Sequence, residues 1–310
     1  MLKYSFTIII LLIIQIRTFS QKITTDYWDN GKKVREGILI DTIRDGKWTW
    51  WYKSGNLWKE GNYNKGVKIG KWVTYYDDGN IQSQEFMENG TNIFWYPNKM
   101  KKSEVNVVNG KYEGKFTSWY DNGNIDEEIE YKKGIKEGRT TKYHKNGNKS
   151  FEGIYVNDKL NCYGIWWYDN GNKEMEGKLI DDEQDSIWIF YYNNGKTGSK
   201  GNFIKGKQDG KWVYFYETGE KWKEGAFVDG KKSGKWITYF ESGKKFKEGN
   251  FVDGKEEGEW RQYFENGNLE KLFNFKSGKM NGKCEAWYKN LKAVTSGKCW
   301  SWEHYILVII

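Results

Sequence analysis

The chain has 310 residues, of which 36 are glycine and one is proline; 18% are aromatic, although only 37% are hydrophobic. A disordered chain is poor in aromatic residues, so this composition excludes disorder and favours short strands joined by tight turns. The net charge of +8 comes from interleaved basic and acidic residues, and the lack of a basic block argues against nucleic-acid binding.

The first twenty residues have the pattern of a secretory signal peptide, with a short basic start, an apolar run over 4–16 and Ser20 at the predicted cleavage point. The apolar run is too short to cross the hydrocarbon core of a bilayer as a helix, which disfavours the alternative of an uncleaved anchor. No cysteine lies near the cleavage point, so a lipid anchor is not expected. Without Lys3 and Arg17 the chain keeps 48 basic and 42 acidic residues, a net charge of +6. We expect a secreted, periplasmic or cell-surface protein.

From residue 27 onward, a motif of two aromatic residues, two polar residues and a glycine recurs every 24 residues. Its copies end at Gly31, Gly55, Gly79, Gly123, Gly147, Gly171, Gly195, Gly219, Gly243 and Gly267. Two degenerate copies carry Lys99 and Leu291 at the glycine position, and only the step from Gly79 to Lys99 is shorter, at 20 residues. The spacing predicts about twelve units.

Each unit is predicted to be one β-hairpin. Trp212 and Tyr214 point to one face of the first strand, Gly219 makes the turn, and Gly225 and Phe227 share a face of the return strand. The unit closes with a loop over 229–234. A glycine in the return strand lets a bulky neighbouring aromatic lie against bare backbone.

The predicted fold is an all-β, elongated array of stacked antiparallel β-hairpins over 21–300, because one hairpin alone is marginal in water and stacked hairpins bury each other's aromatic rows. The apolar residues within 301–310 form either a C-terminal strand or a truncated repeat.

The Gly-Lys-Trp, Tyr-Tyr-x-x-Gly and Glu-Gly-x-Tyr/Phe steps resemble the bacterial MORN-variant repeats over nearly all of 22–300. That resemblance implies stacked hairpins. Such modules are commonly labelled as antitoxins of toxin–antitoxin systems, which implies a neutralising role, and other MORN repeats are linked to membrane lipid binding and to scaffolding. The resemblance assigns no role to any single residue.

The aromatic position four residues before the turn glycine supplies the candidate partner-binding residues Trp51, Trp95, Trp119 and Trp167. A contiguous exposed aromatic patch usually marks a binding site. The alternative for most of these residues, and the favoured one, is packing between repeats.

A row of glutamates precedes the return-strand glycine, at Glu36, Glu60, Glu152, Glu176, Glu224 and Glu248. Equivalent residues one repeat apart are separated by ~10 Å, and nothing distinguishes one from another. We therefore interpret the row as a solvated ladder that pairs with lysines such as Lys211 and Lys235, and not as a pair of catalytic carboxylates.

The three cysteines are an odd number for an oxidising compartment. Cys284 and Cys299 fall in the two strands of the last full hairpin, where a disulfide would clamp a decayed unit, and the alternative leaves them unpaired. Cys162 replaces a loop glycine and is expected to be free. His144 occupies an otherwise aromatic column as a packing substitute, and His304 has no assigned role.

The stretch 85–102 departs from the repeat, with a shortened loop, Pro97 in the turn and Asn92 in place of tryptophan. We interpret it as a kink or repeat decay; the alternative is a functional notch.

No nucleophile elbow, phosphate-binding loop, dinucleotide fingerprint or metal-ligand spacing occurs, so no catalytic, cofactor or metal site is expected. The leading hypothesis is a secreted, non-enzymatic scaffold for protein–protein interaction, of which an antitoxin- or immunity-like neutraliser is one form. The alternative is a surface protein that binds glycan or envelope through its aromatic rows. Lysine-driven association with a membrane surface is a weaker third hypothesis.

Overall fold

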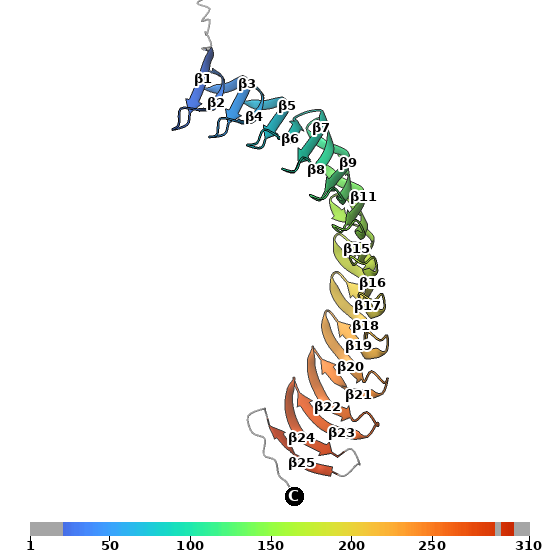
Figure 1. Cartoon of the computed structure of the whole chain (residues 1–310). Coiled ribbons are helices and arrows are strands. Elements are labelled where there is room, and N and C mark those ends of the chain that lie inside the picture. The colour runs from blue at the N-terminus through green and yellow to red at the C-terminus, as the bar shows by residue number, and fades with distance from the viewer. Residues whose placement is uncertain (1–20, 289–292, 301–310) are drawn as a thin grey trace, which may run out of the picture. The chain divides into compact units, whose positions relative to one another are not determined.

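The computed structural model describes residues 21–288 and, for the backbone alone, 293–300. Two compact units divide the chain: one comprises the residues up to Met100 together with Val107–Gly110, and the other Lys101–Asn106 together with the residues from Lys111 onward. Every regular element in the described ranges is a β-strand (Figure 1). The predicted signal peptide, 1–20, and the tail, 301–310, lie outside the described residues.

The first unit contains β1 (Gln21–Tyr27), β2 (Lys33–Ile40), β3 (Ile43–Trp51), β4 (Leu57–Asn64), β5 (Val67–Tyr75), β6 (Ile81–Phe86) and β7 (Gly90–Trp95). Strand β8 (Lys101–Val108) is followed in the second unit by β9 (Lys111–Trp119), β10 (Ile125–Lys132), β11 (Ile135–Tyr143), β12 (Lys149–Val156), β13 (Lys159–Leu160), β14 (Cys162–Trp167), β15 (Lys173–Ile180), β16 (Glu183–Tyr191), β17 (Thr197–Ile204), β18 (Lys207–Phe215), β19 (Lys221–Val228), β20 (Lys231–Tyr239), β21 (Lys245–Val252), β22 (Lys255–Tyr263), β23 (Leu269–Lys276), β24 (Lys279–Trp287) and β25 (Ala293–Trp300).

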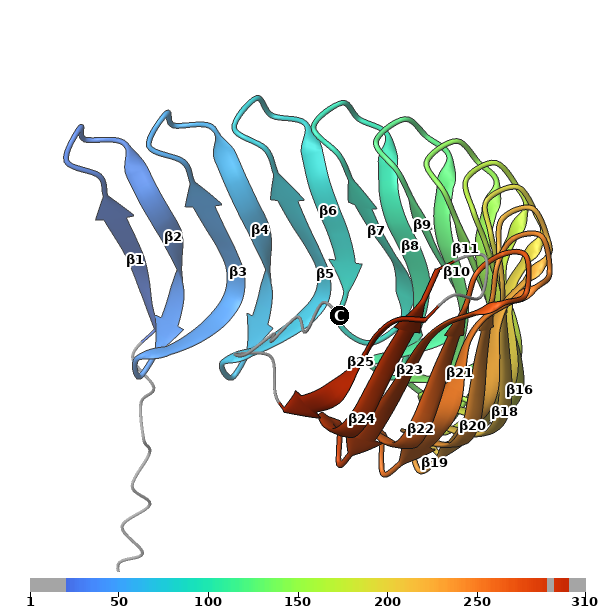
Figure 2. The same ribbon diagram turned by 90° about the horizontal axis from the view of Figure 1, so that it is seen from below.

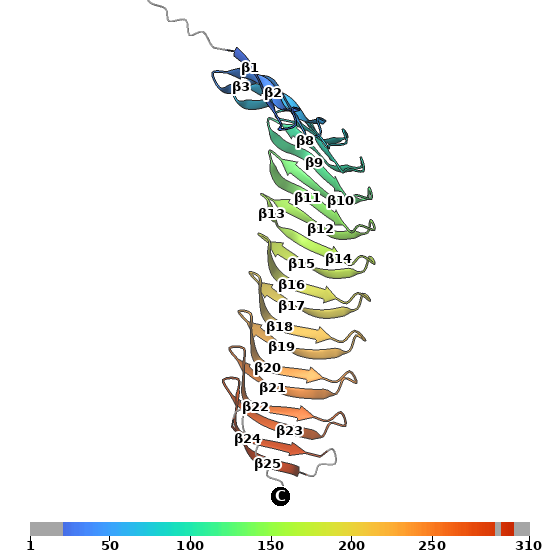
Figure 3. The same ribbon diagram turned by 60° about the vertical axis from the view of Figure 1, so that its left-hand side comes forward.

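Strands pair antiparallel with the strands next to them in sequence, as β18 does with β17 and β19. Figure 3 shows the resulting stack of hairpins in the second unit. The prediction of an all-β array of stacked antiparallel hairpins is confirmed.

Two kinds of turn join the strands and lie at opposite edges of each unit (Figure 2). At the tip turns, which carry the aromatic–glycine motif, the amide of Gly195 donates to the carbonyl of Tyr192 at 2.8 Å, and Gly195 has a φ of +82°. At the other edge, Asp229 and Gly230 have φ values of 50° and 79°, as a two-residue type I′ turn requires. The predicted closing loop over 229–234 is therefore wrong, because β20 already begins at Lys231.

Long strands carry a bulge that bends them. In β18, Val213 pairs with Lys200 and Asp209 pairs with Asn202, so three residues of β18 lie opposite Gly201 alone. Gly210 supplies a φ of +64° at this point, a conformation that glycine adopts without steric cost. The Gly-Lys-Trp step is thus the bulge and the core residue that follows it.

The irregular stretch 85–102 keeps its hairpin but loses the bulge. The shortened strand β7 pairs with β6, and the amide of Phe86 donates to the buried Asn92 Oδ1 at 2.6 Å. The ring of Phe86 lies where a Cβ on Gly90 would stand, 2.3 Å away. Lys99 takes the turn position with a φ of 69°.

Candidate partner-binding surface

One face of the sheet, here called the core face, buries a row of tryptophans against glycines. The indole of each tryptophan lies over the return-strand glycine of the preceding unit; the pairs are Gly37–Trp48, Gly61–Trp72, Gly177–Trp188, Gly201–Trp212, Gly225–Trp236 and Gly249–Trp260. Trp212 is 1% exposed, and its Nε1 donates to the carbonyl of Asn202 at 3.1 Å. Phe203 packs edge-on to this indole with the ring centroids 5.2 Å apart. The expectation that the glycine makes room for an aromatic is confirmed.

Side chains on the two sides of this contact vary together where the glycine is absent. Ile129 stands at the glycine position of its unit, and the residue opposite it is Thr140 in place of tryptophan. Both are buried, at 3% and 1% exposure. Val105 precedes the smaller Phe116 in the same way. At these two contacts a larger residue at the glycine position is matched by a smaller one at the tryptophan position, as close packing of an interior requires.

The core face opens between β12 and β14, where Gly153 keeps the return-strand glycine but Gly164 stands in place of the tryptophan. The rings of Phe151 and Trp166 occupy the space beside these glycines, with ring centroids 4.6 Å apart. An open pocket of about 330 Å³ remains there. Its lining includes Lys142, His144, Ser150, Tyr155, Leu160, Trp167 and Glu174.

A ladder of tyrosines ties successive tip turns together. The hydroxyl of each tyrosine three residues before the turn glycine donates to a backbone carbonyl of the next unit, as Tyr168 does to Tyr191 at 2.8 Å and Tyr216 does to Tyr239 at 2.8 Å. His144 Nε2 lies 2.7 Å from the carbonyl of Trp167. A carbonyl only accepts, so His144 replaces the tyrosine as a hydrogen-bond donor, a role beyond the predicted packing.

The glutamate row lies on the opposite face, here called the glutamate face and defined by Lys211, Val213 and Glu224. Where the next unit has tyrosine four residues before its turn glycine, the phenol donates to the glutamate, as Tyr239 does to Glu224 at 2.6 Å. Lys221 Nζ lies 3.0 Å and Lys211 Nζ 3.4 Å from the same carboxylate. The predicted lysine pairing is present, but the row is not simply solvated.

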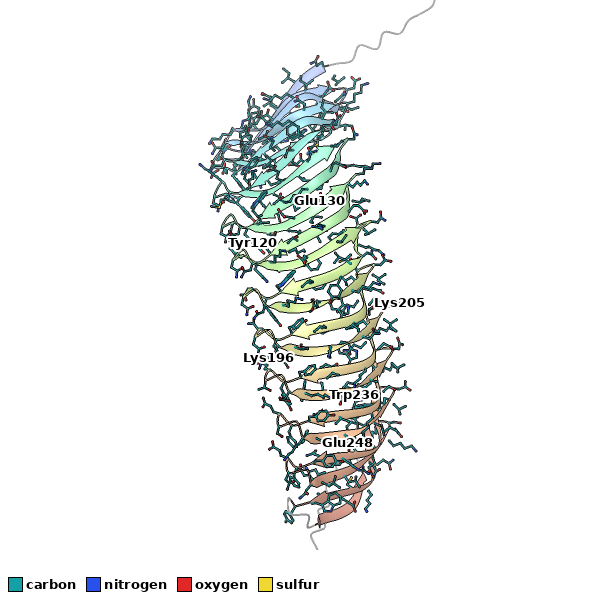
Figure 4. The ribbon with its side chains drawn as sticks, turned by 90° about the vertical axis from the view of Figure 1, so that its right-hand side faces the viewer. Tyr120, Glu130, Lys196, Lys205, Trp236 and Glu248 are labelled. Atoms are coloured by element: carbon teal, nitrogen blue, oxygen red, sulfur yellow. The ribbon has the colours of Figure 1, made fainter. Side chains whose placement is uncertain are left out.

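Burial and charge act against each other on these carboxylates. Burial opposes ionisation of Glu248, yet hydrogen bonds from Lys235, Tyr263 and Lys245 outweigh it and lower its pKa to about 2. The pKa of Glu224 is also lowered, first by the hydrogen bond from Tyr239. Both groups are structural anchors, ionised at neutral pH. Figure 4 shows Glu248 and Trp236 between the tip-turn edge, marked by Tyr120 and Lys196, and the other edge, marked by Lys205.

The four predicted partner-binding tryptophans are all half-buried. Lys33 Nζ lies 5.4 Å from the ring centroid of Trp51, Lys101 Nζ 5.6 Å from that of Trp119 and Lys149 Nζ 5.9 Å from that of Trp167. Each of these lysines also pairs with a glutamate; the pairs are Lys33–Glu36, Lys101–Glu104 and Lys149–Glu152. A lysine thus covers a ring face that a ligand would need for stacking.

These tryptophans do not form one patch. Trp119 and Trp167 belong to the second unit but stand two repeats apart, with Tyr143 in the intervening repeat. Trp51 and Trp95 belong to the first unit and are likewise two repeats apart. Their role in binding a partner stays a prediction.

The glutamate face also carries a row of exposed aliphatic side chains that was not predicted from the sequence. Five aliphatic residues recur nine positions after the turn glycine and stand 39 to 59% exposed; they are Val156, Ile180, Ile204, Val228 and Val252, and we call them the aliphatic stripe. Most are paired across the tight turn with a lysine, as Ile204 is with Lys207 and Val228 with Lys231. The signal was available as a 24-residue recurrence of Val or Ile directly before a two-residue turn, which is Asn-Asp, Asp-Asp, Lys-Gly or Asp-Gly.

Two further apolar residues widen the stripe. Tyr163 and Ile187 stand where Lys211 and Lys235 stand in later repeats, and they are 55% and 63% exposed. Ile154, 43% exposed, lies on the same face in β12. The result is a row of exposed apolar side chains from β12 to β21, in which lysines such as Lys207 and Lys231 stand on the intervening strands.

The predicted disulfide involves a strand whose side chains are outside the described part. In the backbone register, Cys284 pairs with Gly297 and Cys299 with Gly282, which places the two cysteines diagonally on one face of adjacent strands. The disulfide stays a prediction. Cys162 is free, as expected, and burial raises the pKa of its thiol.

In the described ranges, no helix is long and apolar enough to cross a bilayer. Among the same residues, no group of His, Cys, Asp and Glu side chains is arranged to hold a metal ion. His304 lies outside the described residues.

The fold and this surface define a repeat protein of stacked β-hairpins. Five segments match the family model described as MORN repeat variant; they are residues 44–65, 68–89, 112–133, 232–253 and 256–277. The description of this family model names a repeat and does not assign an antitoxin function. No curated protein matches the sequence.

Solved structures with a detectable likeness are much longer chains. The crystal structure of TcdB2-TccC3-Cdc42 is 11% identical, with 88% of this chain and 17% of that chain covered and a TM-score of 0.18. The structure of the Photorhabdus luminescens Tc holotoxin pore is 10% identical, with 90% of this chain and 17% of that chain covered and a TM-score of 0.17. This chain therefore spans less than a fifth of the length of those chains, and no inference about its function is taken from them.

Proposed function

We propose that this protein is a secreted, non-enzymatic scaffold that binds a protein partner through the aliphatic stripe. The observation that carries the proposal is the exposure, in register over five repeats, of Val156, Ile180, Ile204, Val228 and Val252. Large exposed apolar surfaces on a folded chain commonly mark interaction sites, and here the exposed apolar residues recur in register with lysines between them. Repeat arrays use such extended surfaces to bind partners.

The stripe favours a protein partner over a glycan. Aliphatic side chains have no π face for a sugar ring, and the indoles of Trp51, Trp119 and Trp167 are covered by lysines. A protein interface combines apolar contacts with polar ones, and the stripe with its interleaved Lys207 and Lys231 offers both. The MORN-variant matches support a scaffold. Neutralisation of a toxin, as an antitoxin or immunity protein does, is the sharper form of this proposal.

The test is affinity capture with mature protein, residues 21–310, from the envelope and culture fractions of the source organism. A second bait carries Ile204→Thr, Val228→Thr and Val252→Thr, which keep the β-branched shape and remove apolar surface. A control bait carries Ile43→Thr and Val67→Thr, which are exposed aliphatic positions of the first unit.

We expect one protein to be retained near stoichiometry by the unmodified and control baits and lost from the stripe variant. Retention of a glycan without a dominant protein, or equal capture by all three baits, contradicts the proposal. For the sharper form, the captured protein must harm cells when expressed alone and must lose that effect when this chain is supplied with it.

A further inference from the structure

Three lysines of consecutive strands converge over the tryptophan row on the core face. Lys223 of β19 has its Nζ 4.5 Å from the ring centroid of Tyr214, and Lys247 of β21 has its Nζ 4.8 Å from that of Trp260. Between them, Lys232 of β20 places its Nζ 4.8 Å from the ring centroids of both Trp236 and Phe251. The three ammonium groups therefore lie down on aromatic faces. We call them the lysine cluster.

The bend of the strands explains how these side chains meet. Lys223 and Lys247 both pair with Thr238, whereas Lys232 stands six residues earlier in β20, beyond the bulge glycine Gly234. In a straight strand this separation would be ~20 Å. Because the strand bends at the bulge, side chains from its two arms reach over the same part of the core.

Among the residues that the structure describes, no carboxylate forms an ion pair with a member of the cluster. Burial and the charge of Lys232 lower the pKa of Lys223. Burial lowers the pKa of Lys247 as well, and the repulsion from Lys232 adds to it while Glu256 acts in the opposite direction. On the glutamate face of the same repeats, Lys235 and Lys245 both pair with Glu248.

The first unit contains the same arrangement. The guanidinium of Arg44 lies 4.9 Å from the ring centroid of Trp48, Lys59 Nζ lies 4.9 Å from that of Trp50, and Lys68 Nζ lies 4.5 Å from that of Trp72. Burial and the charges of Lys68 and Arg44 lower the pKa of Lys59. Cations held together on the core face are thus a recurring feature of both units.

Like charges that are half-buried and form no ion pair raise the free energy of the folded chain, and an anion placed among them relieves both the repulsion and the desolvation. We propose that the lysine cluster, Lys223, Lys232 and Lys247, is a binding site for an acidic, Asp- or Glu-rich segment of a polypeptide. The site lies on the face opposite the aliphatic stripe and goes beyond the proposed function.

Geometry favours an acidic peptide over other anions. The three lysines belong to strands ~4.8 Å apart, so the cluster extends over ~10 Å, which is more than one phosphate group spans. An extended peptide presents carboxylates on one side every ~7 Å, and their flexible side chains reach ammonium groups that lie flat on rings. A lipid surface would first meet the exposed lysines of the other face, Lys207, Lys231 and Lys255.

The test measures binding of a fluorescent oligo-glutamate peptide to mature protein 21–310 by anisotropy. The cluster variant carries Lys223→Gln, Lys232→Gln and Lys247→Gln. A matched control carries Lys207→Gln, Lys231→Gln and Lys255→Gln, which remove the same charge from the same repeats on the opposite face. Inorganic phosphate and anionic lipid vesicles are measured in parallel.

We expect the cluster variant to bind the peptide about tenfold more weakly or worse, and the control to bind it within about twofold of the unmodified protein. In the unmodified protein, NMR titration of lysine Cε signals should show that the peptide raises the pKa of Lys223 and Lys247. This second measurement stands even where the variant folds poorly.

Equal weakening by both variants would reduce the effect to net charge and overturn the proposal. So would binding of phosphate as tight as that of the peptide, binding of vesicles without the peptide, or unchanged lysine signals. If the peptide does not bind the lysine cluster, the affinity capture through the aliphatic stripe is unaffected. If the stripe variant loses its captured protein, peptide binding at the lysine cluster is unaffected. The two experiments therefore test the two proposals separately.

Discussion

The indole of Trp212 fills the space that a Cβ on Gly201 would need: a Cβ at that position would lie 2.2 Å from the ring, closer than atoms can approach. The same contact recurs in both units, so at six places one glycine and one tryptophan join a hairpin to the next. The register of the array and its buried core therefore depend on the same pair of residues.

The Gly201–Trp212 contact predicts that Gly201→Ala destabilises the fold by about 1–3 kcal/mol, because overpacking forces the ring out of place. Gly201→Ile should destabilise the fold more than Gly201→Ala, because its side chain is larger. Combining Gly201→Ile with Trp212→Thr copies the natural pair Ile129 and Thr140. Urea unfolding should then show a loss smaller than the sum of the two single changes, with a coupling of about 1–3 kcal/mol. If the losses of unfolding free energy from the two single changes simply add in the double variant, the two side chains do not compensate for each other's volume.

Tyr168 donates to the carbonyl of Tyr191 at 2.8 Å in the tyrosine ladder. Tyr168→Phe should cost about 0.5–1.5 kcal/mol of unfolding free energy, the net value of one hydrogen bond. At Phe240 the chain already has phenylalanine in the ladder position, so the reverse change, Phe240→Tyr, should raise the unfolding free energy by a similar or smaller amount. Urea denaturation measures the unfolding free energy of both variants. A Tyr168→Phe protein as stable as the unmodified one would show that the ladder contributes nothing.

Glu248 predicts a specific loss of stability in acid. Its pKa falls from 4.5 to about 2 on folding, so its ionised form stabilises the fold fully above pH 4.5. That contribution is lost as the pH falls from 4.5 toward 2. In Glu248→Gln, the unfolding free energy should be lower at pH 7 and should decline less over this interval. The control is Glu265→Gln, at an exposed tip position, which should retain the steep decline.

The cysteines predict a defined labelling pattern. With a disulfide between Cys284 and Cys299, alkylation of the denatured, unreduced protein should modify Cys162 alone, and prior reduction should expose all three cysteines. Peptide mapping by mass spectrometry identifies the labelled sites. Labelling of all three cysteines before reduction would exclude the disulfide.

The signal peptide predicts that the mature protein begins at Gln21. Expression with residues 1–20 intact should place the processed chain outside the cytoplasm, and N-terminal sequencing checks the cleavage site. A chain that keeps residues 1–20 in the cytoplasmic fraction would contradict secretion.

Much of the fold follows from the 24-residue spacing. The turn glycine of each unit and the aromatic pair before it predict where the hairpin turns, because a tight turn needs a residue that tolerates positive φ. The aromatic–glycine contact is also predictable, since a glycine such as Gly201 recurs inside the return strand, where no turn requires it, next to rows of aromatic residues. The covariation of Ile129 with Thr140 could have been seen in the same columns, as could the aliphatic stripe.

The sequence by itself determined the hairpins, their order and their spacing, because turns and strand alternation depend on neighbouring residues. Only the tertiary structure decided which aromatic rows are buried. Trp212 and Trp167 are the same residue type in the first strand of a repeat, yet Trp212 is enclosed, in a strand that bends at the Gly210 bulge, whereas Trp167 of β14 is half-buried. The corresponding bend at Gly234 brings Lys223 and Lys232 close together on the core face, although they are nine residues apart in the sequence. A contact of that kind depends on the path of the backbone in space, which local alternation does not contain.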